Sequence, residues 1–122
     1  MKMTNNEIYS HANQLLEVFQ DTTQKLPIKI NFYLQKNKST LVSLAQEIEK
    51  TRMEIAQSYG ELDNETNSFV IPPEKMIEAS KELNDLFNLE QDVNIYMINI
   101  NSLSDDYDMT TAQMEAIMFM IE

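Results

Sequence analysis

A seven-residue recurrence of large apolar residues runs through the first half of the chain and constrains the fold more than any other feature. Leu34, Leu41, Ile48 and Ile55 follow one another at this interval. Seven residues make about two turns of an α-helix, so residues at this spacing share one helical face. The pattern predicts a single helix over residues 27–59, roughly 50 Å long at about 1.5 Å per residue. We expect part of such a helix to project, bend or pack on a partner.

The beginning and end of this helix carry separate signals. Apolar residues alternate over 28–34 as they would in a strand, but the longer recurrence favours a helix. Pro27 suits the first helical turn, where its missing N–H group costs nothing. Gly60 follows Tyr59, and we expect it to end the helix as a left-handed C-terminal cap.

Shorter helices are predicted on both sides of the long one. Thr4 and Glu7 form a capping box, which predicts a first helix from about Asn5 to Asp21. A third helix should begin near Pro73 and end near residue 88. A last helix, capped by Thr110 or Thr111, should place Met114, Ile117, Met118 and Ile121 on one face.

Two segments read as strands. Residues 69–71 precede Pro72-Pro73 and can form only a short strand, whereas residues 92–100 have the strongest strand pattern of the chain. The third helix lies between them and makes a β-α-β unit whose crossover is long enough for parallel pairing, while the direction of pairing stays open. The expected fold is therefore mainly α (α+β) and a single domain over residues 1–122. A long central helix packs with an N-terminal helix, a small two-stranded β-α-β unit and a C-terminal helix.

The composition argues against the common types of catalytic and cofactor site. Gly60 is the single glycine, which excludes the glycine-rich loops that bind nucleotide phosphates, and the absence of cysteine excludes thiolate chemistry. His11 is the single histidine; Glu7 lies one turn before it, but no nucleophile or second ligand accompanies the pair, so we interpret His11 as a surface or interface residue. Residues 105–108 (DDYD) lack the glycine and glutamate that an EF-hand would need. We predict no enzymatic activity, no cofactor and no metal site.

Charge is divided unequally between the two halves of the chain. Residues 1–60 carry seven basic and six acidic groups, a net +1, whereas residues 61–122 carry two basic and fourteen acidic groups, a net −12. The acidic balance argues against direct nucleic-acid binding and favours a basic protein partner or simple solubility. The tract with Lys25, Lys29, Lys36 and Lys38 contains no acid, and we expect it to balance the acidic half, in this chain or in a neighbouring copy.

Several residues are candidates for binding a protein partner. On the long helix, an apolar face separate from the heptad seam consists of Ile28, Phe32, Val42 and Met53. Near the C-terminus, Met114 and Met118 could form an adaptable apolar surface, although core filling is the commoner use of methionine. An acidic stripe on the third helix consists of Glu74, Glu78, Glu82 and Asp85. This stripe is either a mimic of nucleic-acid phosphates or a solvated helix face.

Four residues are expected to make the structure specific. Asn37 and Arg52 fall on the apolar seam of the long helix. A buried asparagine can specify register. A partly buried arginine needs a carboxylate, which we expect from the acidic half. Tyr59 and Gly60 mark the end of the helix.

Three segments are informative in combination: LPIKINFYLQKNKSTL (residues 26–41), EIEKTRMEIAQSYGE (47–61) and FVIPPEKMIEASKELNDLFNLEQDVNIYMINI (69–100). In order and spacing they resemble a family of small proteins of unknown function encoded by tailed phages of Gram-positive bacteria. The resemblance covers about residues 26–100 and rests on spacing. The features that carry it are the step from Asn37 to Leu41, Arg52, Tyr59-Gly60 and the strand-helix-strand that follows. It implies no activity, cofactor or catalytic residue.

The resemblance implies a phage protein that works by binding, in the host cytoplasm or in the virion. The leading hypothesis is a non-enzymatic protein of virion structure or assembly that binds a phage structural protein and can form a homo-oligomer. The alternative is an acidic nucleic-acid mimic that inhibits a basic host defence enzyme such as a CRISPR effector. Neither hypothesis involves direct nucleic-acid or membrane binding.

Overall fold

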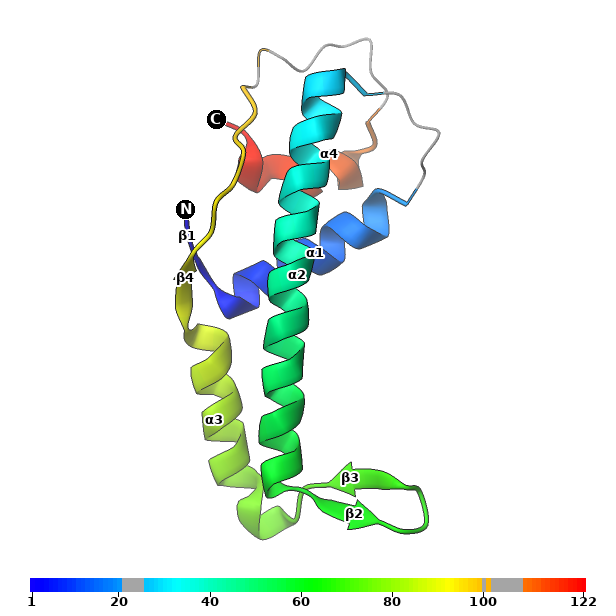
Figure 1. The fold of residues 1–122 in the computed structure, drawn as a ribbon, viewed down its shortest axis with the longest axis vertical. Helices are drawn as coiled ribbons and strands as arrows, with labels where there is room; N and C mark the ends of the chain where they lie inside the picture. Colours follow the sequence, from blue (N-terminus) through cyan, green and yellow to red (C-terminus); the bar gives the residue numbers. More distant parts are fainter. Residues whose placement is uncertain (21–25, 100, 102–108) are drawn as a thin grey trace.

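The long helix α2 (Ile28–Tyr59) forms the axis of the molecule (Figure 1). The structure is a computed structural model that describes residues 1–20, 26–99, 101 and 109–122, with only the backbone of Phe69. Within these residues it is mainly α-helical. The other α-helices are α1 (Asn5–Val18), α3 (Met76–Asn88) and α4 (Thr111–Ile117). The strands are β1 (Lys2–Thr4), β2 (Glu61–Asp63), β3 (Ser68–Val70) and β4 (Glu90–Asp92), and 3₁₀ turns occupy η1 (Pro73–Lys75) and η3 (Met118–Met120).

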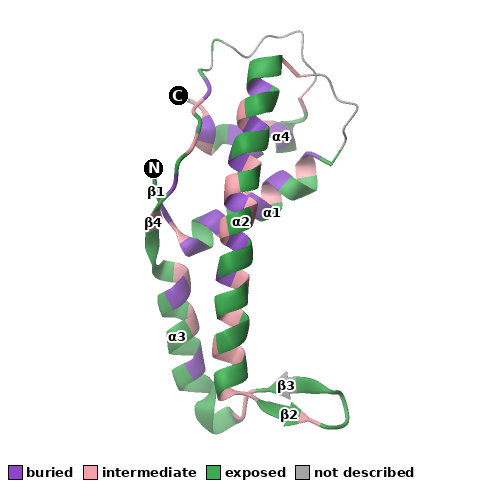
Figure 2. Cartoon of the chain, in the orientation of Figure 1, coloured by how far each residue is buried: buried purple, intermediate pink, exposed green. Residues whose placement is uncertain are grey.

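The apolar seam of α2 is its buried face, and the predicted helix is confirmed. The buried residues recur at intervals of three or four along the helix: Ile30, Leu34, Asn37, Leu41, Ala45 and Ile48. They pack against α1, which crosses α2 near its middle, and α4 in turn packs against α1 in the same core. α3 runs beside the C-terminal half of α2 (Figure 1). Beyond Ile48 no residue of α2 is buried, as the change from purple to green and pink shows (Figure 2).

The capping box at the start of α1 is present as predicted. The Glu7 amide donates to the Thr4 hydroxyl at 3.1 Å, and the Thr4 amide donates to the Glu7 carboxylate at 3.2 Å. Ile8, Ala12 and Leu15 on this helix are buried. The helix ends at Val18, three residues before the predicted end.

The strands pair differently from the predicted β-α-β unit. β3 pairs antiparallel with β2 as a hairpin, and β4 pairs antiparallel with β1, with Lys2 opposite Asp92. The two strands that flank α3 therefore lie in separate two-stranded sheets, and the predicted pairing of these two strands with each other is wrong. In the segment that follows β4, Val93 and Ile98 are buried, and Ile98 forms an isolated parallel bridge with Ile121. The apolar pattern of this segment reflects packing against the core rather than a position in a β-ladder.

Gly60 does not adopt the predicted left-handed conformation. Its φ of −84° and ψ of 156° are extended, so the chain passes directly from α2 into β2. Among the described residues, positive φ occurs at Asn67, at 54°, in the hairpin turn between β2 and β3. Asparagine tolerates this region better than most residues, because its short polar side chain can bond locally. The reversal of the chain is therefore made in the hairpin and not at the helix end.

The C-terminal segment adds a buried face to the core. Thr110 caps α4 in a capping box with Gln113, and Gln113, Ala116, Ile117 and Met120 are the buried side chains of α4 and η3. The expectation that Met118 shares a face with Ile117 is wrong, because Met118 is 64% exposed. The α-helix ends at Ile117 and continues as a 3₁₀ turn, whose period of three residues differs from the α-helical 3.6.

Candidate partner-binding surfaces

Asn37 is fully buried and binds the backbone of the segment after β4. Its amide nitrogen donates to the Tyr96 carbonyl at 2.9 Å, and its amide oxygen accepts from the Tyr96 N–H at 2.8 Å. Met120 Sδ lies 3.4 Å from the same nitrogen. Asn37 therefore fixes where residues 93–98 lie along α2. Its polar group is satisfied within the chain.

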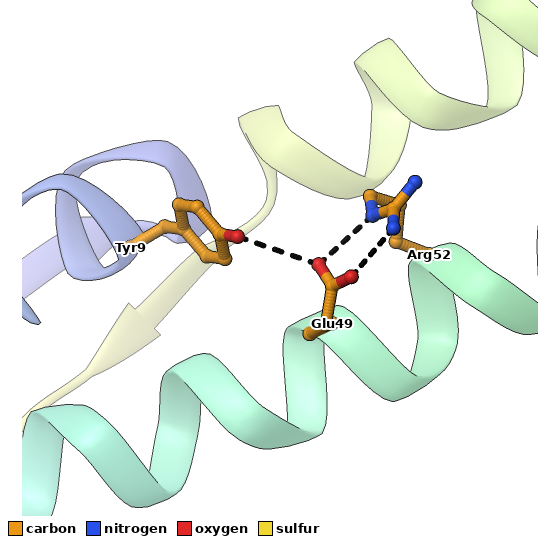
Figure 3. A network of polar contacts seen from close by, with 3 residues as sticks. All are labelled: Tyr9, Glu49 and Arg52. Atoms are coloured by element: carbon orange, nitrogen blue, oxygen red, sulfur yellow. Dashed lines mark hydrogen bonds and ion pairs between the residues drawn. The ribbon is translucent and has the colours of Figure 1, made fainter. Parts of the chain in front are cut away.

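Tyr9, Glu49 and Arg52 form a polar network where α1 crosses α2 (Figure 3). Arg52 Nε donates to Glu49 at 2.8 Å and Arg52 Nη2 donates to the other carboxylate oxygen, while the Tyr9 hydroxyl lies 3.5 Å from Glu49. The hydrogen bond from Arg52 is the main reason why the pKa of Glu49 is lowered, and the same bond raises the pKa of Arg52. The prediction that the acidic half supplies the carboxylate partner of Arg52 is wrong, because that partner is Glu49, one turn earlier on the same helix.

An open groove lies beside this network, between α1 and α2. It has a volume of about 200 Å³ and is lined from α1 by Tyr9, Ala12, Asn13 and Leu16 and from α2 by Val42, Ala45, Gln46 and Glu49. Leu16 is 42% exposed at the groove, whereas Val42 is partly buried against the core. The groove thus has an apolar floor and polar residues at its edge. We define these eight residues as the α1/α2 groove.

The separate apolar face of α2 is only partly covered. Ile28 is 89% exposed, Phe32 54% and Met53 48%, whereas Val42 is partly buried. The structure therefore divides this set between solvent and core. Of the C-terminal candidates, Met114 packs partly against the core and Met118 is exposed.

Lysine and aromatic side chains alternate at the N-terminal end of α2. Lys29 Nζ lies 5.6 Å from the centre of the Tyr33 ring, and Lys36 Nζ lies 5.5 Å from that of Phe32. Tyr33 also packs against Tyr96, with ring centres 5.3 Å apart. Within the described part of the chain, the ion pair formed is Arg52–Glu49, so these lysines have no carboxylate within 4.0 Å. Lys25 lies outside the described residues.

The acidic stripe is exposed along its whole length. Glu74 lies in η1, and Glu78, Glu82 and Asp85 lie on α3. The Glu82 carboxylate faces the Tyr59 hydroxyl, and its proximity raises the pKa of that hydroxyl. Tyr59, at the end of α2, therefore lies close to Glu82 of α3.

His11 is half-buried and stacks on Phe119, with ring centres 4.2 Å apart. Its Nδ1 atom is buried and has no hydrogen-bond partner. Burial lowers the pKa of His11, and the nearby Glu7 carboxylate partly opposes this effect. The environment favours the neutral imidazole as a packing group between α1 and the C-terminal segment.

Metal binding and membrane insertion were considered from the sequence. Residues 105–108, considered for calcium, lie outside the described residues. In the ranges that the structure describes, no group of three or more His, Asp or Glu side chains could hold a metal ion. None of the helices in these ranges is long and apolar enough to cross a membrane.

The sequence did not single out Leu16, Tyr33 or Tyr96 as surface residues. Leu16 follows the buried Leu15, and two adjacent leucines on a helix do not reveal which one is covered. Tyr33 and Tyr96 meet only because Asn37 places residues 93–98 beside α2. Contacts of this kind depend on tertiary structure and leave no local pattern.

Comparisons with known proteins identified no relative of this chain. A scan against protein-family models gave no match, and searches of the curated proteins and of the solved structures gave none either. The resemblance to a phage family therefore stays a prediction.

Proposed function

We propose that this protein is a non-enzymatic binding module that holds apolar side chains of a protein partner in the α1/α2 groove. The observation that carries the proposal is the groove itself, an apolar depression of about 200 Å³ with Leu16 exposed at its edge. The resemblance to phage proteins suggests virion structure or assembly as the setting. The partner is then a phage structural protein, and the site of action is the host cytoplasm or the virion.

The groove has the composition of an interface. Apolar residues line its floor, and Asn13, Gln46 and Glu49 supply polar groups around them. An apolar core with a polar rim is the usual arrangement of protein–protein contacts. Because the walls are two helices, an amphipathic helix that inserts one or two apolar side chains fits the groove best. Each such side chain would contribute about 1.5–3 kcal/mol on full burial.

A substitution at the edge of the groove tests this proposal. Leu16→Glu places a charge where the partner's apolar side chain would lie, and because Leu16 is already 42% exposed the fold should tolerate it. Ser10→Glu is the matched control, at an exposed position of the same helix outside the groove. The wild type and Ser10→Glu should retain phage proteins from infected cells, and Leu16→Glu should lose them. Equal retention by all three would refute the assignment of the groove.

A second function is supported by the exposed acidic stripe. Glu78, Glu82 and Asp85 all face solvent on α3, as a mimic of nucleic-acid phosphates requires. In this alternative the protein occupies the basic groove of a host defence enzyme, such as a CRISPR effector. The triple variant E78K/E82K/D85K should then abolish inhibition, whereas Leu16→Glu should leave it unchanged. Inhibition that survives the charge reversal would exclude mimicry.

A further inference from the structure

We propose that the basic–aromatic patch at the N-terminal end of α2 binds the acidic stripe on α3 of a second copy of this chain. The patch consists of Ile28, Lys29, Phe32, Tyr33, Lys36 and Tyr96. Its counterpart centres on Glu78 and Asp85. This self-association goes beyond the proposed function and uses residues outside the α1/α2 groove.

The patch combines exposed apolar surface with two lysines that have no carboxylate partner among the described residues. Ile28 and Phe32 are 89% and 54% exposed, and Tyr96 is 39% exposed. Lys29 and Lys36 lie over the rings of Tyr33 and Phe32, which holds both ammonium groups at this surface. No carboxylate of the described residues lies within 4.0 Å of either lysine. Such a patch favours a partner that presents carboxylates beside an apolar side chain.

The acidic stripe has the matching spacing. Lys29 and Lys36 are seven residues apart on α2, and Glu78 and Asp85 are seven residues apart on α3. At about 1.5 Å per residue, both pairs span roughly 10 Å, so two packed helices can align both ion pairs at once. Ile77, at the edge of the stripe, is 84% exposed and could cover Ile28 or Phe32.

Tyr59 and Lys81 lie close to the acidic stripe, but neither neutralises its carboxylates. Glu82 lies beside the Tyr59 hydroxyl, which leaves Glu74, Glu78 and Asp85 for a second copy, and Glu78 and Asp85 have the spacing of the two lysines. Lys81 lies on the same helix between them, but within the described residues it forms no ion pair with either acid. The stripe therefore keeps carboxylates that a basic surface can bind.

The acidic stripe of one chain lies away from the patch of the same chain. The patch is at the N-terminal end of α2, whereas α3 lies beside the C-terminal half of the same helix (Figure 1). Pairing is therefore intermolecular. Two copies can pair reciprocally in an antiparallel dimer, or each copy can bind the next in a head-to-tail array. Both arrangements bring the same two surfaces together.

Charge reversal on each surface tests the pairing. The molar mass of the full chain would be measured by sedimentation equilibrium over a range of concentrations. We expect the wild type to self-associate, and we expect K29E/K36E and E78K/D85K each to weaken association more than about tenfold. The four substitutions combined in one chain should restore it, because the two surfaces again carry opposite charges. Phe32→Gln should weaken association without any change of charge.

The variants also separate specific pairing from general repulsion. K29E/K36E makes the net charge of −11 more negative by four units, and the control K2E/K50E does the same at exposed lysines outside the patch. This control should associate as the wild type does. E78K/D85K lowers the general repulsion, so a general charge effect would strengthen association where specific pairing weakens it.

Three results would overturn the self-association. They are a wild type that is monomeric at every concentration, equal loss in K2E/K50E and K29E/K36E, and no recovery in the combined variant. Circular dichroism of each variant would show whether it is folded. Leu16→Glu should keep self-association while losing a partner from the groove, so failure of one proposal does not imply failure of the other.

Discussion

Asn37 is the residue whose side chain most directly joins two parts of the fold. It is fully buried, and it makes both a donor and an acceptor contact with the backbone of Tyr96. A leucine at this position has a similar volume but leaves the Tyr96 N–H and C=O groups unpaired. Unpaired buried polar groups destabilise a protein by about 1–3 kcal/mol each.

We expect Asn37→Leu to reduce the free energy of unfolding by about 2–4 kcal/mol in urea titrations, because two polar groups lose their partners. Asn31→Leu is the control, at an exposed position of the same helix, and should change stability by less than about 0.5 kcal/mol. Equal stability of the wild type and Asn37→Leu would show that the two hydrogen bonds contribute little.

His11 should make stability depend on pH near neutrality. Its pKa is lowered in the folded state, so the unfolded chain binds the proton more readily. Stability is therefore complete above the unfolded value of about 6.5 and falls as the pH drops from there through the lowered pKa. In His11→Gln, the free energy of unfolding should vary less between about pH 7 and pH 5. An unchanged slope would contradict this role.

The pH dependence of Glu49 lies in a different range. Because its pKa is also lowered, its contribution is present above the ordinary value of about 4.3 and is lost at lower pH. Arg52 and Glu49 are more than a third exposed at the side chain, so the pair stabilises the fold by less than about 1 kcal/mol.

At the scale of elements, a substitution at Gly60 distinguishes a left-handed glycine cap from a helix that continues into an extended backbone. A left-handed glycine cap would be destabilised by alanine, but the observed φ of −84° is open to any residue. We expect Gly60→Ala to leave the melting temperature unchanged or to raise it slightly, because alanine restricts the unfolded chain. Asn67→Val, at a φ of 54°, should lower it. A clear loss of stability in Gly60→Ala would contradict the extended conformation.

The sequence was most informative where contacts are local. The heptad recurrence outweighed the strand-like alternation over residues 28–34 and correctly predicted α2, and Thr4 with Glu7 marked the start of α1. Strand pairing was predicted from proximity in sequence and was wrong, because β4 pairs with β1 about ninety residues away. The groove and most of the patch could not be predicted from the sequence for the same reason, because each joins side chains from separate segments.

At the scale of the whole molecule, the core is concentrated toward one end of α2. The buried residues of this helix lie between Ile30 and Ile48, and the part beyond is covered mainly by α3, where Ala79 and Leu86 are buried. The hairpin β2–β3 continues from this thinly packed end (Figure 2). Local opening is easiest where few apolar side chains are buried.

Hydrogen exchange should follow this division. Backbone amides over residues 51–59 of α2 should exchange roughly tenfold or more faster than those over residues 34–48, because less buried surface opposes their opening. Exchange measured by mass spectrometry on peptides from the two ranges would show the difference. Uniform protection along α2 would indicate that α3 stabilises the far end as strongly as the core does.

The segment over residues 90–98 has a consequence for how fast the chain folds. β4 pairs with β1, near the start of the chain, and Ile98 pairs with Ile121, near its end. Helical turns form within about a microsecond, but these two pairings must first close loops of many residues. Folding rates fall as contacts become more distant in sequence. Despite its helical content, this chain should therefore fold more slowly than a simple helical bundle of the same length.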